Sequence, residues 1–141
     1  MILFCDTSAL IKLYIKEAFS EEVHVQATMT KGVAVSRIAW AEAMAALARR
    51  VRENPIDAEA IETVRTKMHD DWSGFAIVEV TQSLVELAGE YADTFALRGY
   101  DSVQLASAHL VQKAANEELC FACFDTRLKK AAKALGIRVL E

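Results

Sequence analysis

The chain has 141 residues, of which 53% are hydrophobic, so we expect one domain over residues 1–141 with a buried core rather than a disordered chain. Lys and Arg number 16 and Asp and Glu 20, and the formal net charge of −4 excludes a bulk electrostatic attraction for nucleic acid or an anionic membrane. No apolar run approaches the roughly 20 residues that cross a bilayer, and three cysteines, an odd number, argue against a disulfide framework, so we expect a cytoplasmic protein.

The chain opens with the apolar run Met1–Cys5, which stops on Asp6 and passes at once into Thr7, Ser8 and a helix-forming segment. This pattern is typical of a strand buried on both faces followed by a helix, which we expect to end near residue 17. Asp6 then lies at the carboxyl end of a strand, where open parallel α/β sheets bind their ligands. We expect Thr7 or Ser8 to cap the helix and to leave the Asp6 carboxylate free.

Two later helix starts carry recognisable capping signals. Ser36 is expected to cap a long helix that runs from Arg37 to about Glu53. Asp101 is expected at another N-cap, and Gln104, three residues later, completes a capping-box pattern.

Strand-like and helix-like segments alternate through the rest of the chain. The further expected elements are a helix over 20–30, a short strand over 33–35, a helix over 56–72, a strand over 75–80, helices over about 83–97 and 101–115, a strand over 119–124, a helix over 127–135 and a strand over 137–140. Strands that alternate with helices of ten or more residues imply parallel pairing through right-handed crossovers. The predicted fold is therefore a three-layer α/β/α sandwich with a central parallel sheet of about five strands.

Acidic residues stand out at positions where a side chain could reach a binding site: Asp6, Glu42, Asp101 and Asp125. Asp125 ends a second apolar run, so an Asp-Thr pair closes two of the expected strands. If those strands are parallel neighbours at about 4.8 Å, the carboxylates of Asp6 and Asp125 would nearly touch, and they would share a proton or recruit a cation. Glu42 lies on an otherwise apolar helix face, where a carboxylate needs a partner. Taken alone, each acid has an ordinary explanation, as a helix cap or as a contact with arginine or solvent.

A group of carboxylates suits hard divalent ions such as Mg²⁺ or Mn²⁺, which take oxygen ligands. A metal-bound water can attack a phosphodiester while the metal neutralises the charge that develops on the phosphate. A bound cation would also let an acidic site approach a polyanion. The acids therefore predict a metal-dependent site for phosphoester hydrolysis.

Other chemistries have less support in the sequence. Cys120 and Cys123 match C-x-x-C, but residues three apart on a strand point to opposite faces, so buried thiols are expected. The histidines lack zinc-motif spacing, and no G-x-G-x-x-G, Walker loop or G-x-S-x-G is present. Arg49, Arg50 and Arg52 cluster near a helix end, where interaction with the helix dipole is more ordinary than contact with an RNA backbone.

The acids and their flanking residues resemble the PIN-domain ribonucleases, specifically the VapC-type toxins of bacterial and archaeal toxin–antitoxin pairs. The segments that carry the resemblance are Phe4–Leu10, Glu42, Arg98–Ala108 and Phe124–Leu128. The resemblance implies a parallel sheet, a Mg²⁺- or Mn²⁺-dependent endoribonuclease that acts on RNA, a homodimer, and a VapB-like antitoxin that inserts a segment into the active site.

The resemblance also implies a role for each acid. It makes metal ligands of Asp6, Glu42, Asp101 and Asp125, with Ser8 as a supporting hydroxyl near the first of them. The chain departs from the family pattern at Cys123, where Thr or Ser is common two residues before the fourth acid. Two alternatives to a toxin stay open at this point, a PIN-domain nuclease of RNA processing and a non-catalytic module that binds RNA or protein.

Overall fold

The computed structural model describes residues 1–141 as alternating strands and helices. The strands are β1 (Ile2–Cys5), β2 (Val33–Ser36), β3 (Ala76–Val78), β4 (Leu119–Ala122) and β5 (Arg138–Val139). The helices are α1 (Thr7–Lys12), α2 (Ser20–Thr28), α3 (Ala39–Glu53), α4 (Ala58–Trp72), α5 (Gln82–Phe95), α6 (Gly99–Ala115) and α7 (Thr126–Ala134), with a short 3-10 helix, η1 (Pro55–Asp57), between α3 and α4. No helix combines the length and the apolar composition needed to span a membrane.

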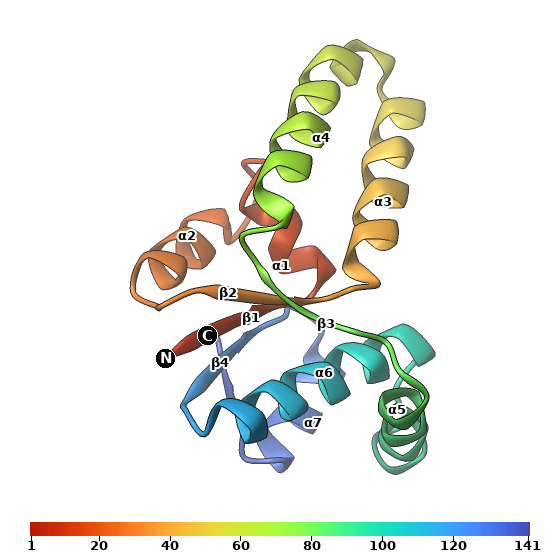
Figure 1. The fold of residues 1–141 in the computed structure, drawn as a ribbon. Helices are drawn as coiled ribbons and strands as arrows, with labels where there is room; N and C mark the ends of the chain where they lie inside the picture. The colour runs from red at the N-terminus through yellow and green to blue at the C-terminus, as the bar shows by residue number, and fades with distance from the viewer.

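All strands pair in parallel in one 5-stranded sheet of order β3-β2-β1-β4-β5. Figure 1 shows α1, α2 and the hairpin of α3 and α4 on one side of this sheet, and α5, α6 and α7 on the other. The predicted three-layer sandwich with about five parallel strands is therefore confirmed.

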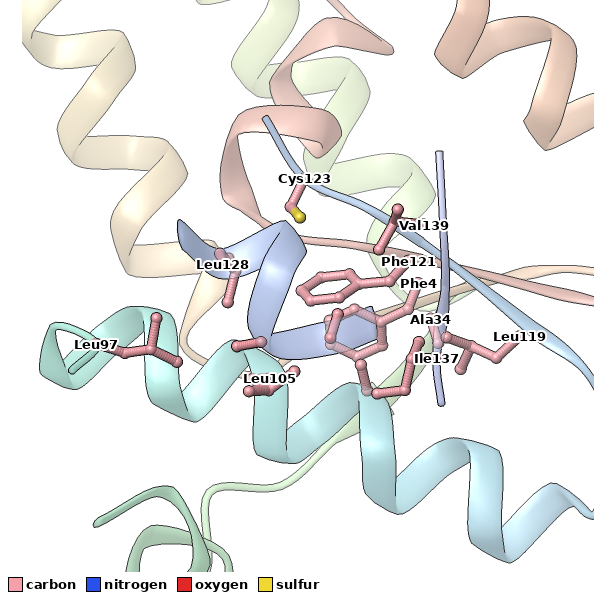
Figure 2. Packing of buried hydrophobic residues seen from close by; sticks show 13 residues of the cluster. Phe4, Ala34, Leu97, Leu105, Leu119, Phe121, Cys123, Leu128, Ile137 and Val139 are labelled. Carbon is pink, nitrogen blue, oxygen red and sulfur yellow. The ribbon is translucent and has the colours of Figure 1, made fainter. Parts of the chain in front are cut away.

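Alternating residues of β1 and β4 contribute to the two larger hydrophobic cores, because successive side chains on a strand point to opposite faces. Phe4 and Phe121 are partners in register, and their rings meet edge to face at 5.6 Å between the sheet and helices α6 and α7 (Figure 2). Leu3 and Cys5 point the other way, into the core with Met68 beneath α1 and α4. Both β1 and β4 are buried along most of their length, as their apolar sequences predict.

Among the predicted helix boundaries, the end of the first helix and the start of the long helix are wrong. The first helix ends at Lys12 rather than near residue 17, because the following turn is closed by Ser20, whose Oγ donates to the Ile15 carbonyl oxygen and accepts from the Glu17 amide. The long helix begins at Ala39 rather than residue 37, because Ser36 is the last residue of β2 and does not cap it.

The central position of β1 decides where the site forms. Its carboxyl end lies between β2 and β4, so the segments that follow these three strands leave the sheet at the same edge. α1 and α7 begin at this edge, directly after β1 and shortly after β4.

Candidate active site

Asp6 follows β1 directly, and its backbone amide continues the ladder by donating to the Ala122 carbonyl oxygen at 3.1 Å. Its Oδ1 accepts from the Ala9 amide at 2.9 Å and from the Ser8 hydroxyl at 2.8 Å. The prediction that Thr7 or Ser8 caps α1 is therefore wrong, because Asp6 is the N-cap and Ser8 supports it. Both hydrogen bonds use Oδ1, so Oδ2 is left for the cleft that Asp6 lines.

Glu42 lies in the first turn of α3 and is held from two other helices. Its Oε1 accepts from the Thr7 hydroxyl at 2.7 Å and from the Gln104 amide at 3.0 Å. Gln104 also donates to the Thr7 hydroxyl at 3.3 Å, which closes the triangle. Glu42, a carboxylate on an apolar helix face, is thus partnered by two neutral hydrogen-bond donors, Thr7 of α1 and Gln104 of α6.

Asp101 is the third residue of α6 rather than its N-cap, a position that Arg98 occupies. The predicted capping box is also wrong, because Gln104 turns its amide to Glu42 and Thr7 instead of to the helix start. Because the helix begins earlier than expected, Asp101 lies in its first turn, where it lines the same cleft as Asp6 and Glu42.

Asp125 is the N-cap of α7, and its Oδ1 accepts from the Leu128 amide at 2.9 Å. The strands before Asp6 and Asp125 are parallel neighbours, which meets the condition for their carboxylates to approach each other, and Cys5 lies opposite Ala122. This register sets Asp6 level with Cys123, so Asp125 lies two residues further along than Asp6. Asp125 is exposed, whereas Asp6 is buried with 8% of its surface accessible.

One open cleft of about 560 Å³ gathers the four predicted acids, together with Ser8, Thr7, Arg98, Gln104 and Phe124 among its lining residues. Burial raises the pKa of Asp6 to about 6, against the lowering effect of its hydrogen bonds and with a further rise from the charges of Asp101 and Glu42. Burial also raises the pKa of Asp101, helped by Asp125 and Glu42 and opposed by Arg98. The charge of exposed Asp125 therefore acts on Asp101, and the charge of Asp101 in turn acts on buried Asp6.

The donor atoms of this cleft fit a hard divalent cation, since they are carboxylate oxygens. Burial is the main cause of the raised pKa values of Asp6 and Asp101, and the neighbouring carboxylates add to the rise, so a cation would favour the ionised form of both groups. Asp6 and Glu42 each use one oxygen for the protein hydrogen bonds described above and keep the other. The structure does not group three or more His, Cys, Asp or Glu side chains so that they could hold a metal ion. A cation would therefore have to draw carboxylates together that repel one another in its absence.

Sequence reasoning missed two residues that organise the acids, Thr7 and Gln104. Gln104 is 2% exposed, and its Oε1 is a buried oxygen without a hydrogen-bond partner. The signal was a long polar side chain within a run of α6, Ser102–Ala108, that is buried throughout. Its partners could not be predicted, because they lie 62 and 97 residues away in sequence.

A second cleft of about 540 Å³ shares Asp101 and Asp125 with the first and carries positive charge on its walls. Its basic residues are Arg98, Arg127 and Lys130. By contrast, Arg49 and Arg50 pair with Glu53 and Glu17, and all three cysteines are free and buried as predicted.

Comparison with known proteins agrees with the fold and identifies the family. The PIN domain family matches residues 3–134. Ribonuclease VapC45 of Mycobacterium tuberculosis is 33% identical over 138 residues, which cover 98% of this chain and 94% of the relative. Among solved structures, FitAcB from Neisseria gonorrhoeae superposes with a TM-score of 0.68 at 18% identity, covering 100% of this chain and 97% of that one. A toxin-antitoxin complex from Klebsiella pneumoniae gives a TM-score of 0.52 at 22% identity, with 85% and 84% covered. The chain therefore belongs to the PIN-domain family and, within it, to the VapC ribonucleases.

Proposed function

We propose that this chain is an endoribonuclease that hydrolyses RNA phosphodiester bonds and serves as the toxin of a VapBC-type toxin–antitoxin pair. The observation that carries this function is the meeting of Asp6, Glu42, Asp101 and Asp125 in one cleft, in a chain that belongs to the VapC ribonucleases. We further propose that residues 1–141 work as one nuclease domain.

The four acids are proposed to hold Mg²⁺ or Mn²⁺, with Ser8 in a supporting role. Such an ion, when bound, would activate a water and neutralise charge on the phosphate. The protein's part is orientation: Ser8 and the Ala9 amide fix one oxygen of Asp6, and Thr7 and Gln104 fix one oxygen of Glu42. These hydrogen bonds set the direction in which the free oxygens point.

Positive charge beside the acids supports RNA as the substrate. The net charge of −4 gives no general attraction for a polyanion, so the phosphates need a local basic surface. Arg98, Arg127 and Lys130 line the cleft that shares Asp101 and Asp125 with the acidic one. RNA phosphates on these side chains would bring a phosphodiester to the carboxylates.

A VapB-like antitoxin, a homodimer and a cytoplasmic location are part of the same proposal. The partner is supported by the structural similarity to a toxin-antitoxin complex from Klebsiella pneumoniae. Co-expression distinguishes a toxin from a PIN-domain nuclease of RNA processing, because a toxin should arrest growth unless its antitoxin is supplied.

Cleavage of RNA by the purified protein with Mn²⁺ tests the proposed chemistry. Asp6→Asn should abolish cleavage and leave the fold intact, since asparagine can still accept the cap hydrogen bond from Ala9. Asp70→Asn is the matched control, because Asp70 is 73% exposed and lies on α4, outside the cleft. Equal cleavage by Asp6→Asn would remove the metal-site proposal, and no cleavage of any RNA by the unmodified protein would favour a binding module.

A further inference from the structure

Two phenylalanines form an aromatic step beside the acidic cleft. Phe124 lines the cleft and directly precedes Asp125. Phe19, from the turn between α1 and α2, stacks on Phe124 with ring centroids 5.4 Å apart and an interplanar angle of 20°. Phe19 is nevertheless 58% exposed. A large aromatic ring that remains so open to solvent contributes little to the core, so its position calls for another explanation.

The backbone of Phe19 is strained, with a φ of 69°. A residue with a side chain in this left-handed region costs roughly 1–2 kcal/mol, and a bulky one is rare there. The other non-glycine residues with positive φ, Ala96 and Asn116, end helices, where this conformation is ordinary. Phe19 instead precedes α2, in a turn that the Ser20 hydroxyl closes. The turn thus holds an exposed ring at the cleft edge at a cost in stability.

Two lysine ammonium groups lie close to the ring of Phe124, the less exposed member of the aromatic step. The Nζ atoms of Lys12 and Lys129 lie 4.7 and 5.6 Å from the centroid of Phe124. Lys12 is further fixed by an ion pair with Glu17 at 2.9 Å, and Glu17 also binds Arg50 of α3. An aromatic face next to ammonium groups matches the two parts of a nucleotide, a flat base and a negative phosphate.

We propose that the aromatic step of Phe19 and Phe124 is a subsite for one unstacked nucleobase of single-stranded RNA, and that Lys129 meets the phosphate beside it. Proteins that read RNA commonly stack splayed-out bases on aromatic side chains. Phe124 and Asp125 are consecutive, so a base on this step has its phosphate next to the carboxylates. The inference rests on the proposed nuclease function and adds to it the feature of the substrate that positions the bond to be cleaved.

The substitution Phe19→Gly distinguishes a loss of base stacking from a loss of protein stability. Glycine adopts a positive φ without strain, so the free energy of unfolding should stay equal or rise while RNA binding weakens. Met29→Ala is the matched control, because Met29 is a 67% exposed apolar residue at the far end of α2. Binding is measured by fluorescence anisotropy of a labelled single-stranded oligoribonucleotide, with Ca²⁺ as the only divalent ion and a gel to verify that the RNA stays intact.

We expect Phe19→Gly to weaken binding about 5- to 150-fold, the range that stacking of one base supplies. A series of oligonucleotides in which each base in turn is replaced by an abasic site should contain one position where the unmodified protein loses a similar factor. With the RNA that is abasic at that position, Phe19→Gly should weaken binding no further, because no base is present there to stack on the ring. Met29→Ala should bind every oligonucleotide as the unmodified protein does.

Binding of all oligonucleotides by Phe19→Gly at unmodified affinity would overturn the subsite, even if the unmodified protein cleaves RNA. An equal loss at every abasic position would also overturn it, because a general effect is not stacking of one base. Unchanged RNA affinity with loss of binding to the co-expressed antitoxin would assign the aromatic step to a protein partner instead. Phe19-dependent binding by a protein that cleaves no RNA would leave the subsite standing and remove the nuclease function.

Discussion

Asp6 combines two demands that conflict in the absence of a cation. Its Oδ1 caps α1 through the Ala9 amide, which favours the ionised form. Its burial disfavours that form more strongly and raises the pKa from 3.8 to about 6. A carboxylate that is both buried and close to Glu42 and Asp101 is stabilised by whatever positive charge enters the cleft. The residue proposed to bind a metal is thus a source of instability near neutral pH without one.

Asp6→Asn is expected to stabilise the metal-free protein near neutral pH. The folded chain holds the Asp6 proton more tightly than the unfolded chain, so the contribution of this group to stability is fully present below pH 3.8 and is lost as pH rises through about 6. The difference of roughly two pKa units corresponds to about 3 kcal/mol, and asparagine removes the penalty. Urea unfolding in EDTA should show the gain at about pH 7.5 and little gain near pH 4.

Asp70→Asn serves as the control for this comparison, because Asp70 is an exposed acid on α4. It should change the free energy of unfolding by less than about 0.5 kcal/mol at either pH. A metal-free Asp6→Asn protein that is no more stable than the unmodified one at neutral pH would contradict the raised pKa.

Gln104 is expected to act as a positioning residue for Glu42. In Gln104→Leu, Glu42 Oε1 keeps only the Thr7 hydroxyl, so its free oxygen loses a fixed direction. Stability should change little, because the lost hydrogen bonds are offset by removal of the buried, unpartnered Oε1. Cleavage should fall about 10-fold or more, and the Mn²⁺ concentration for half-maximal activity should rise.

Gln112→Leu provides a glutamine on the same helix that lines a different cleft. It should leave both the cleavage rate and the Mn²⁺ dependence unchanged. If Gln104→Leu shows the Mn²⁺ dependence of the unmodified protein, the orienting role of its amide is wrong.

At the scale of elements, the sequence predicted well what depends on local pattern. An apolar run that stops on an aspartate marked the end of β1, and the second such run marked β4 but placed its end two residues too late, since β4 ends at Ala122. Alternation with helices predicted a parallel sheet. The identity of the capping atoms was not predictable in the same way, since Asp6, Thr7 and Ser8 are all good N-cap residues. Only the approach of Glu42 from α3 decides that Thr7 turns away and Asp6 caps.

The register of the strands could not be predicted from the sequence either. Identical Asp-Thr turns after β1 and β4 suggested carboxylates at the same level, yet Cys5 pairs with Ala122 and sets Asp125 two residues further out. The register follows from packing across the whole sheet, including the Phe4 and Phe121 pair, which a local pattern does not contain. The acids therefore meet around Asp101 rather than as a touching pair.

Asp125 is expected to serve α7 and the active site at once, and two substitutions separate these roles. Asp125→Asn keeps an acceptor for the Leu128 amide, whereas Asp125→Ala removes it and should cost about 1 kcal/mol of stability. Both should lower cleavage by more than about 10-fold, because both remove the negative charge next to Asp101. Urea unfolding and a cleavage assay on the same preparations measure the two effects. Full cleavage by Asp125→Asn would reduce Asp125 to a helix cap.

At the scale of the whole molecule, the sheet separates the two larger hydrophobic cores and places all the catalytic candidates at one edge. The acids come from the segments after β1 and β4 and from the starts of α3 and α6, so no single element contains the site. The hydrogen bonds that join these segments span 35 to 97 residues of sequence. The geometry of the cleft is consequently a property of the complete fold.

The edge-to-face pair of Phe4 and Phe121 ties β1 to β4 and should be measurable as a coupling energy (Figure 2). Phe4→Leu and Phe121→Leu are each expected to cost up to about 1.5 kcal/mol, because leucine is apolar and of comparable size. The double variant should lose about 0.5–1.5 kcal/mol less than the sum of the single variants, since the ring contact is broken by the first substitution.

Met68→Leu is the control for additivity, because Met68 belongs to the core on the opposite face of the sheet. Combined with Phe121→Leu it should add within about 0.5 kcal/mol. Cleavage at a temperature where every variant is fully folded should stay near the unmodified rate, because both rings point away from the cleft-lining residues into the core beneath α6 and α7. A strict sum for Phe4 and Phe121 would mean that the rings pack against the sheet independently, and that the register of β1 and β4 is set by the backbone ladder and the surrounding aliphatic core.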